Sequence, residues 1–300
     1  MTYDVTVLTD RRWVREDEND WYSRQLHTED RLVLEALQRA GLRAARRAWD
    51  DPDFDWNTTH AALFRTTWDY FDRFAEFSPW LDKVGRSIRL FNEAALIRWN
   101  IDKHYLGALA ESGINTVPTY FVERGDPRSL LNVTAALGWE DLILKPVVSG
   151  AARHTYRFAH TETETLECTF GDLVEAEAMM LQPFQAQVLE AGELSLMVID
   201  GKVTHAIRKT PKKGDFRVQD DHGGSVHQHT PSAEEARFAE AAVAAVPFDV
   251  LYARVDLVRD NAGQLAIMEL EMIEPELFFR FCPEAADRLA HGLAHRLARH

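Results

Sequence analysis

Cysteine and basic charge are both scarce in this 300-residue chain. The two cysteines, Cys168 and Cys282, lie far apart without a second pair, which argues against a disulfide scaffold and a cysteine-based structural zinc site. Lysine and arginine number 34 against 48 acidic residues, so the formal net charge is −14. Nucleic acids and anionic membranes bind basic surfaces, so we expect neither as a partner, although this balance still allows a local basic cleft.

Long hydrophobic runs are missing as well. No segment approaches the roughly 18 apolar residues of a membrane-spanning helix, and the N-terminal residues MTYDVTVLTDRR lack the apolar core and cleavage pattern of a signal peptide. We therefore expect a soluble, unprocessed protein of the cytoplasm. The chain also lacks internal repeats, low-complexity tracts and a persuasive Ser/His/Asp or Cys/His combination, so no nucleophilic side chain stands out.

Apolar residues make up 46% of the chain, which at this length is enough for two or three compact lobes around a shared cleft. The N-terminal part begins as a β-α-β unit, with an apolar strand at residues 5–8 and an amphipathic helix at residues 29–40 that ends before Gly41. This alternation predicts a small open α/β sheet. The later part is rich in strands and hairpins, which indicates α+β lobes; its predicted strands are residues 142–147, 179–182, 193–199, 203–209, 252–258 and 265–271.

The aromatic-rich segment of residues 65–81 has two interpretations. Aromatic side chains dominate protein cores, so a helix buried against the sheet is predicted. The alternative places Arg65 and Asp69 at a loop after a strand, where they contact the substrate.

A polar segment at residues 211–231 has neither helical nor strand periodicity. Loops of this length inside a compact domain are usually functional lids or disordered segments, so a long loop is predicted here.

Two C-terminal strands concentrate carboxylates on one face. Side chains alternate along a strand, so Asp256 lies on the face opposite its apolar neighbours, while Glu269 and Glu271 lie opposite Met268 and Leu270, which are predicted to pack. If the strands pair through the turn between them, the three carboxylates converge on one patch. Like charges repel, so this patch requires a cation or a basic partner.

A hard divalent cation with oxygen ligands suits such a patch. Magnesium prefers a few carboxylates together with phosphates and water, and the chain has no His/Cys cluster of the zinc or iron type. The alternative is a solvated face on which Arg254 and lysines are the partners of the carboxylates. Glu274, which precedes Pro275, could bind a substrate amine or cap the end of a helix or strand.

Several short segments follow one another in a specific order. They are N-I-D-K-H-Y-L around Lys103, I-L-K-P around Lys145, M-L-Q-P-F ending at Phe184, G-E-L-S around Glu193, H-A-I-R-K ending at Lys209, Y-A-R-V-D ending at Asp256, and M-E-L-E ending at Glu271. In order and spacing they resemble the ATP-grasp superfamily, the fold of glutathione synthetase and D-alanine–D-alanine ligase, over residues 90–280.

The resemblance implies an ATP-grasp fold of α/β and α+β type. An N-terminal open α/β pre-ATP-grasp lobe would span residues 1–95, a central lobe residues 96–183, and a C-terminal lobe with the metal site residues 184–300. ATP would lie between the latter two lobes.

The resemblance also assigns the nucleotide contacts. Adenine would contact the hinge at Gln182 and Phe184, and Glu193 would hold the ribose. Lys103 and Lys145 would contact the phosphates.

The transferring phosphoryl group would be bound from the C-terminal lobe. Lys209 would reach the phosphates from the far strand, and Arg254 would steady the phosphoryl group, a role suited to arginine. Asp256, Glu269 and Glu271 would bind one or two Mg²⁺ ions; asparagine is common in the superfamily where Glu271 stands, and either residue provides an oxygen ligand.

The phosphate-covering loop, residues 148–153, has less glycine than is usual in the superfamily. Ser149 and Gly150 are still expected to contact the phosphates, and Arg153 adds positive charge to compensate.

ATP-grasp enzymes phosphorylate a substrate carboxylate and then let a nitrogen displace the phosphate. The R-K-T-P-K-K-G-D-F-R-V-Q and E-L-E-x-I-E-P segments are similar to those of a cyclo-ligase subgroup, which closes O-ureido-D-serine to D-cycloserine in antibiotic biosynthesis. The implied partner is thus a small molecule with carboxylate and amine groups. The alternatives are an intermolecular carboxylate–amine ligase and a non-catalytic nucleotide sensor; the sequence leaves open whether the chain forms a homo-oligomer.

Overall fold

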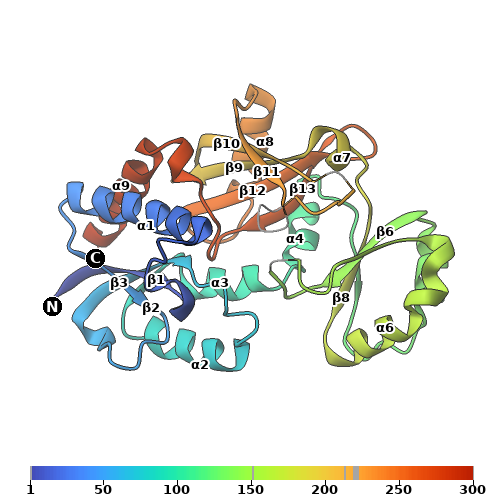
Figure 1. The fold of residues 1–300 in the computed structure, drawn as a ribbon, viewed down its shortest axis with the longest axis horizontal. Coiled ribbons are helices and arrows are strands. Elements are labelled where there is room, and N and C mark those ends of the chain that lie inside the picture. The colour runs from blue at the N-terminus through green and yellow to red at the C-terminus, as the bar shows by residue number, and fades with distance from the viewer. Residues whose placement is uncertain (1, 151, 213, 219–222, 300) are drawn as a thin grey trace.

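The computed structural model describes residues 2–150, 152–212, 214–218 and 223–299. Within them the chain forms three sheets, arranged along the molecule as Figure 1 shows. The first sheet is parallel, in the order β2-β1-β3-β4. Its strands are β1 (Tyr3–Thr9), β2 (Ala44–Ala48), β3 (Thr59–Thr66) and β4 (Arg89–Phe91). The predicted open α/β sheet is confirmed.

Helices cover both faces of this first sheet. Val5, Val7 and Leu63 face α1 (Trp21–Arg39) and α9 (Glu284–Ala298), whereas Leu8 and Phe64 face α2 (Phe74–Gly85) and α3 (Ala94–Ile101). The predicted helix at residues 29–40 is confirmed, but it begins earlier, because the Asp20 carboxylate caps its first turn by accepting from the backbone N–H groups of Tyr22 and Ser23.

The prediction of one helix over residues 65–81 is wrong for its first half. Arg65 belongs to β3, a loop follows, and α2 begins only at Phe74. Phe64 aligns with Leu8 of the parallel strand β1, and pairing with this neighbour extends β3 to Thr66. Asp69 therefore lies in a loop after a strand, where it accepts a hydrogen bond from Trp49 Nε1 at 2.7 Å.

The second sheet forms the lobe on the right of Figure 1. It is antiparallel, in the order β5-β8-β6-β7. Its strands are β5 (Tyr120–Val122), β6 (Asp141–Pro146), β7 (Tyr156–Ala159) and β8 (Met179–Pro183). Two helices, α5 (Leu130–Leu137) and α6 (Thr163–Ala176), supply Val133 and Phe170 to its core.

The third sheet is antiparallel, in the order β11-β10-β9-β12-β13. Its strands are β9 (Glu193–Ile199), β10 (Lys202–Thr210), β11 (Ser225–His229), β12 (Tyr252–Arg259) and β13 (Leu265–Glu271). The predicted hairpin at Asp200-Gly201 joins β9 to β10, and both turn residues have positive φ. Two further helices adjoin this sheet, α7 (Gln187–Ala191) and α8 (Ala233–Ala244).

The segment predicted to be a long loop, residues 211–231, is described only in part, since residues 213 and 219–222 lie outside the described residues. Its later part is the strand β11, so the prediction is wrong there. This strand lies at the edge of the sheet, beside β10 alone, and its polar residues leave no hydrophobic alternation in the sequence.

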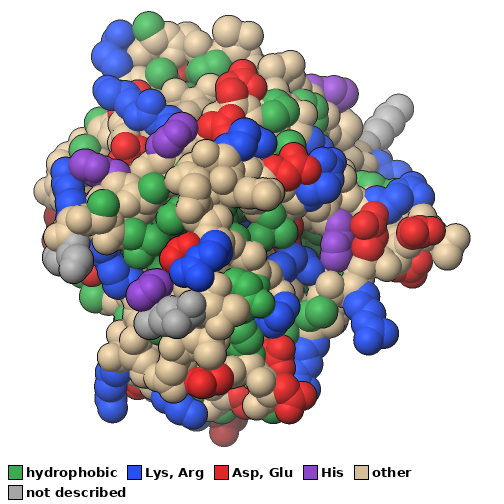
Figure 2. All heavy atoms as spheres, turned by 90° about the vertical axis from the view of Figure 1, so that its left-hand side faces the viewer, with side chains coloured by type: hydrophobic (Ala, Val, Ile, Leu, Met, Phe, Trp, Pro, Cys, Tyr) green, Lys and Arg blue, Asp and Glu red, His purple; other side chains and the backbone are tan. Residues whose placement is uncertain are grey.

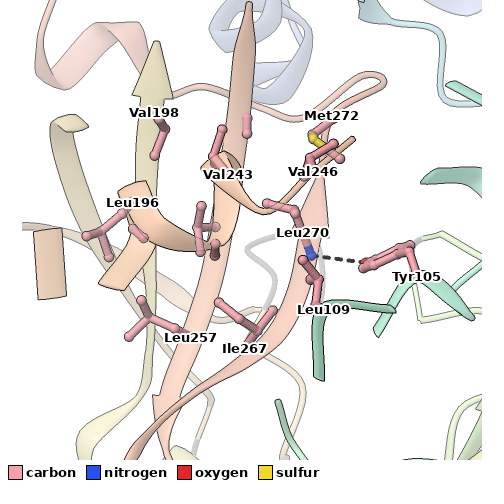
Figure 3. Packing of buried hydrophobic residues seen from close by; sticks show 14 of the residues in the cluster. Tyr105, Leu109, Leu196, Val198, Val243, Val246, Leu257, Ile267, Leu270 and Met272 are labelled. Atoms are coloured by element: carbon pink, nitrogen blue, oxygen red, sulfur yellow. Dashed lines mark hydrogen bonds between the residues drawn. The ribbon is translucent and has the colours of Figure 1, made fainter. Parts of the chain in front are cut away.

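A large hydrophobic core lies under the third sheet, as Figure 3 shows. Leu257 of β12 and Ile267 and Leu270 of β13 pack there with Leu109 of helix α4 (Tyr105–Glu111). The Tyr105 hydroxyl accepts a hydrogen bond from the backbone N–H of Leu270 at 3.0 Å. This contact fixes α4, which lies in the connection between the first and the second sheet, to β13, the strand that carries Glu269 and Glu271.

The C-terminal helix α9 returns to the N-terminal lobe and packs beside α1 (Figure 1). Leu289 and Leu293 share a core with Leu37 of α1 and Met197 of β9. The short 3₁₀ helices are η1 (Arg11–Trp13), η2 (Trp56–Thr58), η3 (His160–Glu162) and η5 (Phe279–Phe281). On the face shown in Figure 2, basic and acidic side chains are interspersed. None of the helices in the described ranges combines the length and the apolar character that crossing a membrane demands.

Candidate active site

A cavity of about 570 Å³ lies where the three sheets approach one another. It is lined by side chains of the second sheet, of the third sheet and of loops of the first. The residues that the family resemblance assigned to the site all line this cavity: Lys103, Lys145, Ser149, Gly150, Arg153, Gln182, Phe184, Glu193, Lys209, Arg254, Asp256, Glu269 and Glu271. Arg65 and Asp69, the alternative substrate contacts, are not among its lining residues. Residues far apart in the sequence thus meet in one place.

One side of the cavity is a charged wall formed by Lys209, Arg254, Asp256, Glu269 and Glu271. Asp256 lies at its centre. Strands β12 and β13 pair with Asp256 opposite Glu269 and with Arg254 opposite Glu271, the pairing that the sequence suggested. Arg254 donates to both Asp256 oxygens, from Nε to Oδ1 at 3.0 Å and from Nη2 to Oδ2 at 2.8 Å. Lys209 Nζ lies 3.3 Å from Oδ1, which also accepts from the Ser195 hydroxyl. Burial disfavours the charge of Asp256, but Arg254 and Lys209 outweigh it and hold the pKa of this carboxyl well below its usual range.

The pKa values of Glu269 and Glu271 shift in opposite directions. Burial disfavours the charge of both side chains. Lys103 Nζ, 3.1 Å from Glu269 Oε1, and Lys145 nonetheless lower the pKa of Glu269. Arg254 also contacts Glu271, but burial, together with the charges of Glu269 and Asp256, raises the pKa of Glu271 to about 7.

The face on which Met268 lies was predicted wrongly. Met268 packs as expected, against the cluster that includes Val258 and Ala266, but it also lines the cavity beside the carboxylates instead of lying opposite them. The strand pairing shifts here, because Asp256 is opposite Glu269 while the next residue, Leu257, is opposite Ile267. Met268 is the extra residue of a β-bulge, which reverses the alternation and sends Ile267 to the core instead.

The carboxylates are ligands of the type that Mg²⁺ prefers, but their side chains do not surround a common ion position. Asp256, Glu269 and Glu271 provide hard oxygen ligands on two adjacent strands facing one cavity. However, among the residues that the structure describes, no three acidic, histidine or cysteine side chains are gathered as a metal cage. Each carboxylate is instead paired with lysine or arginine, so these pairs would have to open for the carboxylates to hold an ion.

Basic side chains face the carboxylates from two lobes. Lys209 lies 3.0 Å from Glu193 Oε1, and burial raises the pKa of Glu193 although Lys209 opposes this. Lys145 projects from β6, and burial lowers its pKa, an effect that the nearby charge of Glu269 partly offsets. Lys103 lies between α3 and α4, where its backbone N–H donates to Val147 O at 3.2 Å and its ammonium donates to Ser149 O at 2.7 Å.

The loop after β6 is tied to its surroundings. Arg153 forms two hydrogen bonds with Glu177, at 2.8 and 2.6 Å, so its charge is already partly compensated. A Cβ atom at Gly150 would lie 2.7 Å from the Phe71 ring, so a larger residue here would force the ring or the loop to move, although the φ angle of Gly150 is not positive. Ala151 of this loop lies outside the described residues.

The part of the cavity around Gln182 and Phe184, which is predicted to contact adenine, is mainly apolar. Val117, Val188, Val218 and Met268 form one hydrophobic cluster beside it. Further contacts fix its polar and aromatic members: Gln182 Nε2 donates to Thr119 Oγ1 at 2.9 Å, the backbone N–H of Phe184 donates to Asp141 O at 2.8 Å, and Phe216 packs edge-on against the Phe184 ring. A flat aromatic base would find apolar contacts here.

The sequence did not predict two parts of the cavity. Ser195 lies on the same face of β9 as Glu193, and strand alternation could have identified it. The N-terminal lobe also contributes aromatic side chains, whose meeting with β13 depends on tertiary structure; they are Trp13, Tyr22, Trp68, Tyr70 and Phe71.

Comparison with known proteins identifies the family. Residues 5–92 match the N-terminal domain of D-cycloserine synthetase DcsG, and residues 142–275 match the RimK-like ATP-grasp domain. The chain is 31% identical over 283 residues to the cycloserine biosynthesis protein DcsG of Streptomyces lavendulae, covering 88% of this chain and 92% of that protein. The chain belongs to the ATP-grasp ligases. It is therefore an ATP-binding enzyme, and the predicted fold and family are confirmed.

Solved structures agree with this membership of the ATP-grasp ligases. The crystal structure of D-cycloserine synthetase DcsG superposes with a TM-score of 0.86 and 28% identity, covering 98% of this chain and 99% of that one. D-alanine–D-alanine ligase from Bacillus anthracis shares the fold, with a TM-score of 0.68 at 14% identity. A probable alpha-L-glutamate ligase of Parasynechococcus marenigrum is 31% identical over 60% of this chain, a region that is only 38% of that protein.

Proposed function

We propose that this ATP-grasp ligase uses ATP and Mg²⁺ to activate the carboxylate of a small amino-acid substrate and then closes a ring within the same molecule. The substrate proposed is O-ureido-D-serine, and the ring is that of D-cycloserine. The observation that carries this choice is the match of residues 5–92 to the N-terminal domain of DcsG, in addition to the match of the ATP-grasp part.

The residues of the cavity have separate roles in this proposal. Lys103, Lys145 and Lys209 neutralise the phosphates of ATP, while Gln182 and Phe184 flank the base and Glu193 holds the ribose. Ser149, Gly150 and Arg153 belong to the loop that covers the phosphates. All of these residues line one cavity, which supports the assignment.

The chemical steps take place at the third sheet. A carboxylate oxygen of the substrate attacks the γ-phosphate and ADP leaves. The ureido nitrogen bonded to the side-chain oxygen then attacks the acyl carbon, and phosphate leaves while this nitrogen loses its proton. Water finally removes the carbamoyl group from the ring nitrogen as carbamate, which decomposes to carbon dioxide and ammonia. Arg254 stabilises the transferring phosphoryl group from its position between Asp256 and Glu271. Asp256, Glu269 and Glu271 would hold Mg²⁺, which supplies charge neutralisation at the phosphates.

Turnover measurements test this function. We expect release of ADP and phosphate from ATP that depends on both Mg²⁺ and O-ureido-D-serine, with D-cycloserine detected by mass spectrometry. Product formation only after addition of a second amine would instead support an intermolecular ligase, the alternative favoured by the similarity to probable alpha-L-glutamate ligases. ATP binding without release in the presence of any amino acid would support a sensor.

A further inference from the structure

One end of the cavity is walled by aromatic rings of the N-terminal lobe. This aromatic wall consists of Trp13, Tyr22, Trp68, Tyr70 and Phe71. Its rings contact one another: Tyr22 and Trp68 stack with centroids 6.2 Å apart, and Trp13 meets Tyr22 edge-on at 5.8 Å. Tyr70 and Phe71 likewise meet edge-on at 5.6 Å. Aromatic faces attract cations, and this attraction is strongest where water is excluded.

Glu274 lines the same cavity and is a buried carboxylate that forms no ion pair with the described residues. Asp256, Glu269 and Glu271 each form an ion pair with lysine or arginine, whereas no such pair reaches Glu274 from the described part of the chain. Burial, reinforced by the charge of Glu274, raises the pKa of the Tyr70 hydroxyl in the aromatic wall. Burial, reinforced by the charge of Glu271, raises the pKa of Glu274 to about 8, and the more distant Lys103 and Arg254 only partly offset this.

The backbone that carries Glu274 is held from two lobes. Three successive carbonyl groups each accept a hydrogen bond from a side chain. Tyr252 Oη donates to Ile273 O at 2.6 Å, Trp68 Nε1 to Glu274 O at 2.9 Å, and Arg65 Nη1 to Pro275 O at 3.1 Å. A carboxylate on so well-fixed a backbone is already in place before a ligand arrives, which lowers the entropic cost of binding.

We propose that Glu274 and the aromatic wall bind the ammonium group of the substrate and so select amino acids over carboxylic acids that lack the amine. Arg12 already lies over the Trp13 ring, 6.0 Å from its centroid, so this wall has one resident cation contact. A substrate ammonium would pair with the Glu274 carboxylate and contact further rings of the wall. Glu274 lies three residues after Glu271, the last residue of β13, and both line one cavity with Arg254, where the carboxylate of the same small zwitterion would be phosphorylated. This inference rests on the proposed function for the position of that carboxylate.

Binding measurements separate this role from a structural one. The probes are O-ureido-D-serine and the analogue in which a hydroxyl replaces the ammonium, each titrated by calorimetry in the presence of a non-hydrolysable ATP analogue. We expect the wild-type enzyme to prefer the amino acid and Glu274→Gln to lose about 10- to 100-fold of its affinity, because a charge-assisted hydrogen bond is removed. Affinity for the hydroxyl analogue should hardly change in this variant.

Two further variants complete the test. Glu190→Gln, at an exposed position of α7 outside the cavity, is the matched control and should bind both probes as the wild type does. Trp68→Phe keeps an aromatic ring but loses the hydrogen bond to Glu274 O, so an intermediate loss of amino-acid affinity is expected. Thermal unfolding of each variant shows whether it is folded.

The outcomes keep the two proposals distinct. Ammonium preference that disappears in Glu274→Gln supports the inference, even if the wild-type enzyme fails to turn the amino acid over, in which case only the proposed function fails. Turnover of O-ureido-D-serine with an unchanged KM in Glu274→Gln overturns the inference and leaves the function standing. A wild-type enzyme that binds the amino acid no better than the hydroxyl analogue also overturns it.

Discussion

Asp256 has several partners in the cavity: Ser195, Lys209 and Arg254 all contact it. Two of these partners also contact other carboxylates of the site, since Lys209 pairs with Glu193 and Arg254 with Glu271. A change at this one side chain therefore redistributes charge across the whole wall.

We expect Asp256→Asn to lower Mg²⁺-dependent ADP formation by at least about 100-fold, because a proposed metal ligand and the partner of Arg254 lose their charge together. Removing one member of a buried ion pair also destabilises the fold, by about 1–3 kcal/mol here, since Arg254 and Lys209 keep their second partners. Steady-state kinetics and urea unfolding measure the two effects. A variant with full turnover would remove Asp256 from the metal site.

His205 predicts a dependence of stability on pH. Its Nε2 lies 2.8 Å from Leu277 O and its Nδ1 lies 2.9 Å from Thr204 Oγ1. Burial lowers its pKa, although the Leu277 carbonyl and the charges of Glu29 and Glu284 partly oppose this. Below a pH of about 6.5 the unfolded chain gains a proton that the folded chain resists, so stability falls as the pH falls.

The measurement is the free energy of unfolding in urea at pH 7.5 and 5.5. The difference between the two values should be smaller in His205→Gln than in the wild type. His291→Gln, at an exposed position of α9, is the control and should leave the difference unchanged. Equal pH dependence in wild type and His205→Gln would contradict the prediction.

At the scale of elements, the loop between β6 and β7 depends on the close approach of Gly150 to the Phe71 ring. We expect Gly150→Ala to displace this loop and to raise the KM for ATP, because a Cβ atom 2.7 Å from the ring cannot be accommodated without movement. Gly171→Ala in α6 is the control: its Cβ meets nothing within 4 Å, so the variant should be more stable by about 0.5–1 kcal/mol with unchanged kinetics. Unchanged ATP kinetics in Gly150→Ala would contradict the proposed role of the loop.

Most strands could be predicted from the sequence because their alternation or apolar runs are local signals. The charged strands β12 and β13 pair as predicted, and the hairpin between β9 and β10 is confirmed. Met268 could not be assigned, since a β-bulge reverses the alternation without a sequence signal. Strand β11 was not predicted because its pairing with β10 defines it rather than its own residues. The start of α2 was placed too early because the pairing of β3 with β1 extends β3 to Thr66.

The charged residues of the candidate site were identified from order and spacing, but their partners were not. Nothing in the sequence indicates that Lys103 contacts Glu269 or that Arg153 contacts Glu177, because these pairs join segments far apart in the chain. The aromatic wall was not predicted either, because its rings belong to the N-terminal lobe and the position of this lobe beside the cavity depends on tertiary packing.

At the scale of the molecule, the first and third sheets share one hydrophobic core through α1 and α9. We expect Leu289→Ala, at a fully buried position of α9, to lower the free energy of unfolding by about 2–5 kcal/mol and the two lobes to unfold together. Leu131→Ala in α5, where the side chain is 44% exposed, should have little effect. Urea unfolding followed by tryptophan fluorescence and by circular dichroism gives coincident transitions if the prediction holds; separate transitions would contradict it.

The ion pairs that line the cavity also have a consequence for the order of binding. Lys103 and Lys209, proposed to bind phosphate, are occupied by the carboxylates proposed to bind Mg²⁺, so each ligand releases the groups that the other requires. Nucleotide and metal should therefore assist one another by an exchange of counterions, with each raising the affinity of the other by the same factor, about 5- to 150-fold. Calorimetric titrations of each ligand, with and without the other, measure this factor, and independent binding would contradict the exchange. Without ligands, these lysines and carboxylates thus neutralise one another, and we expect the pairs to separate when nucleotide and metal bind together.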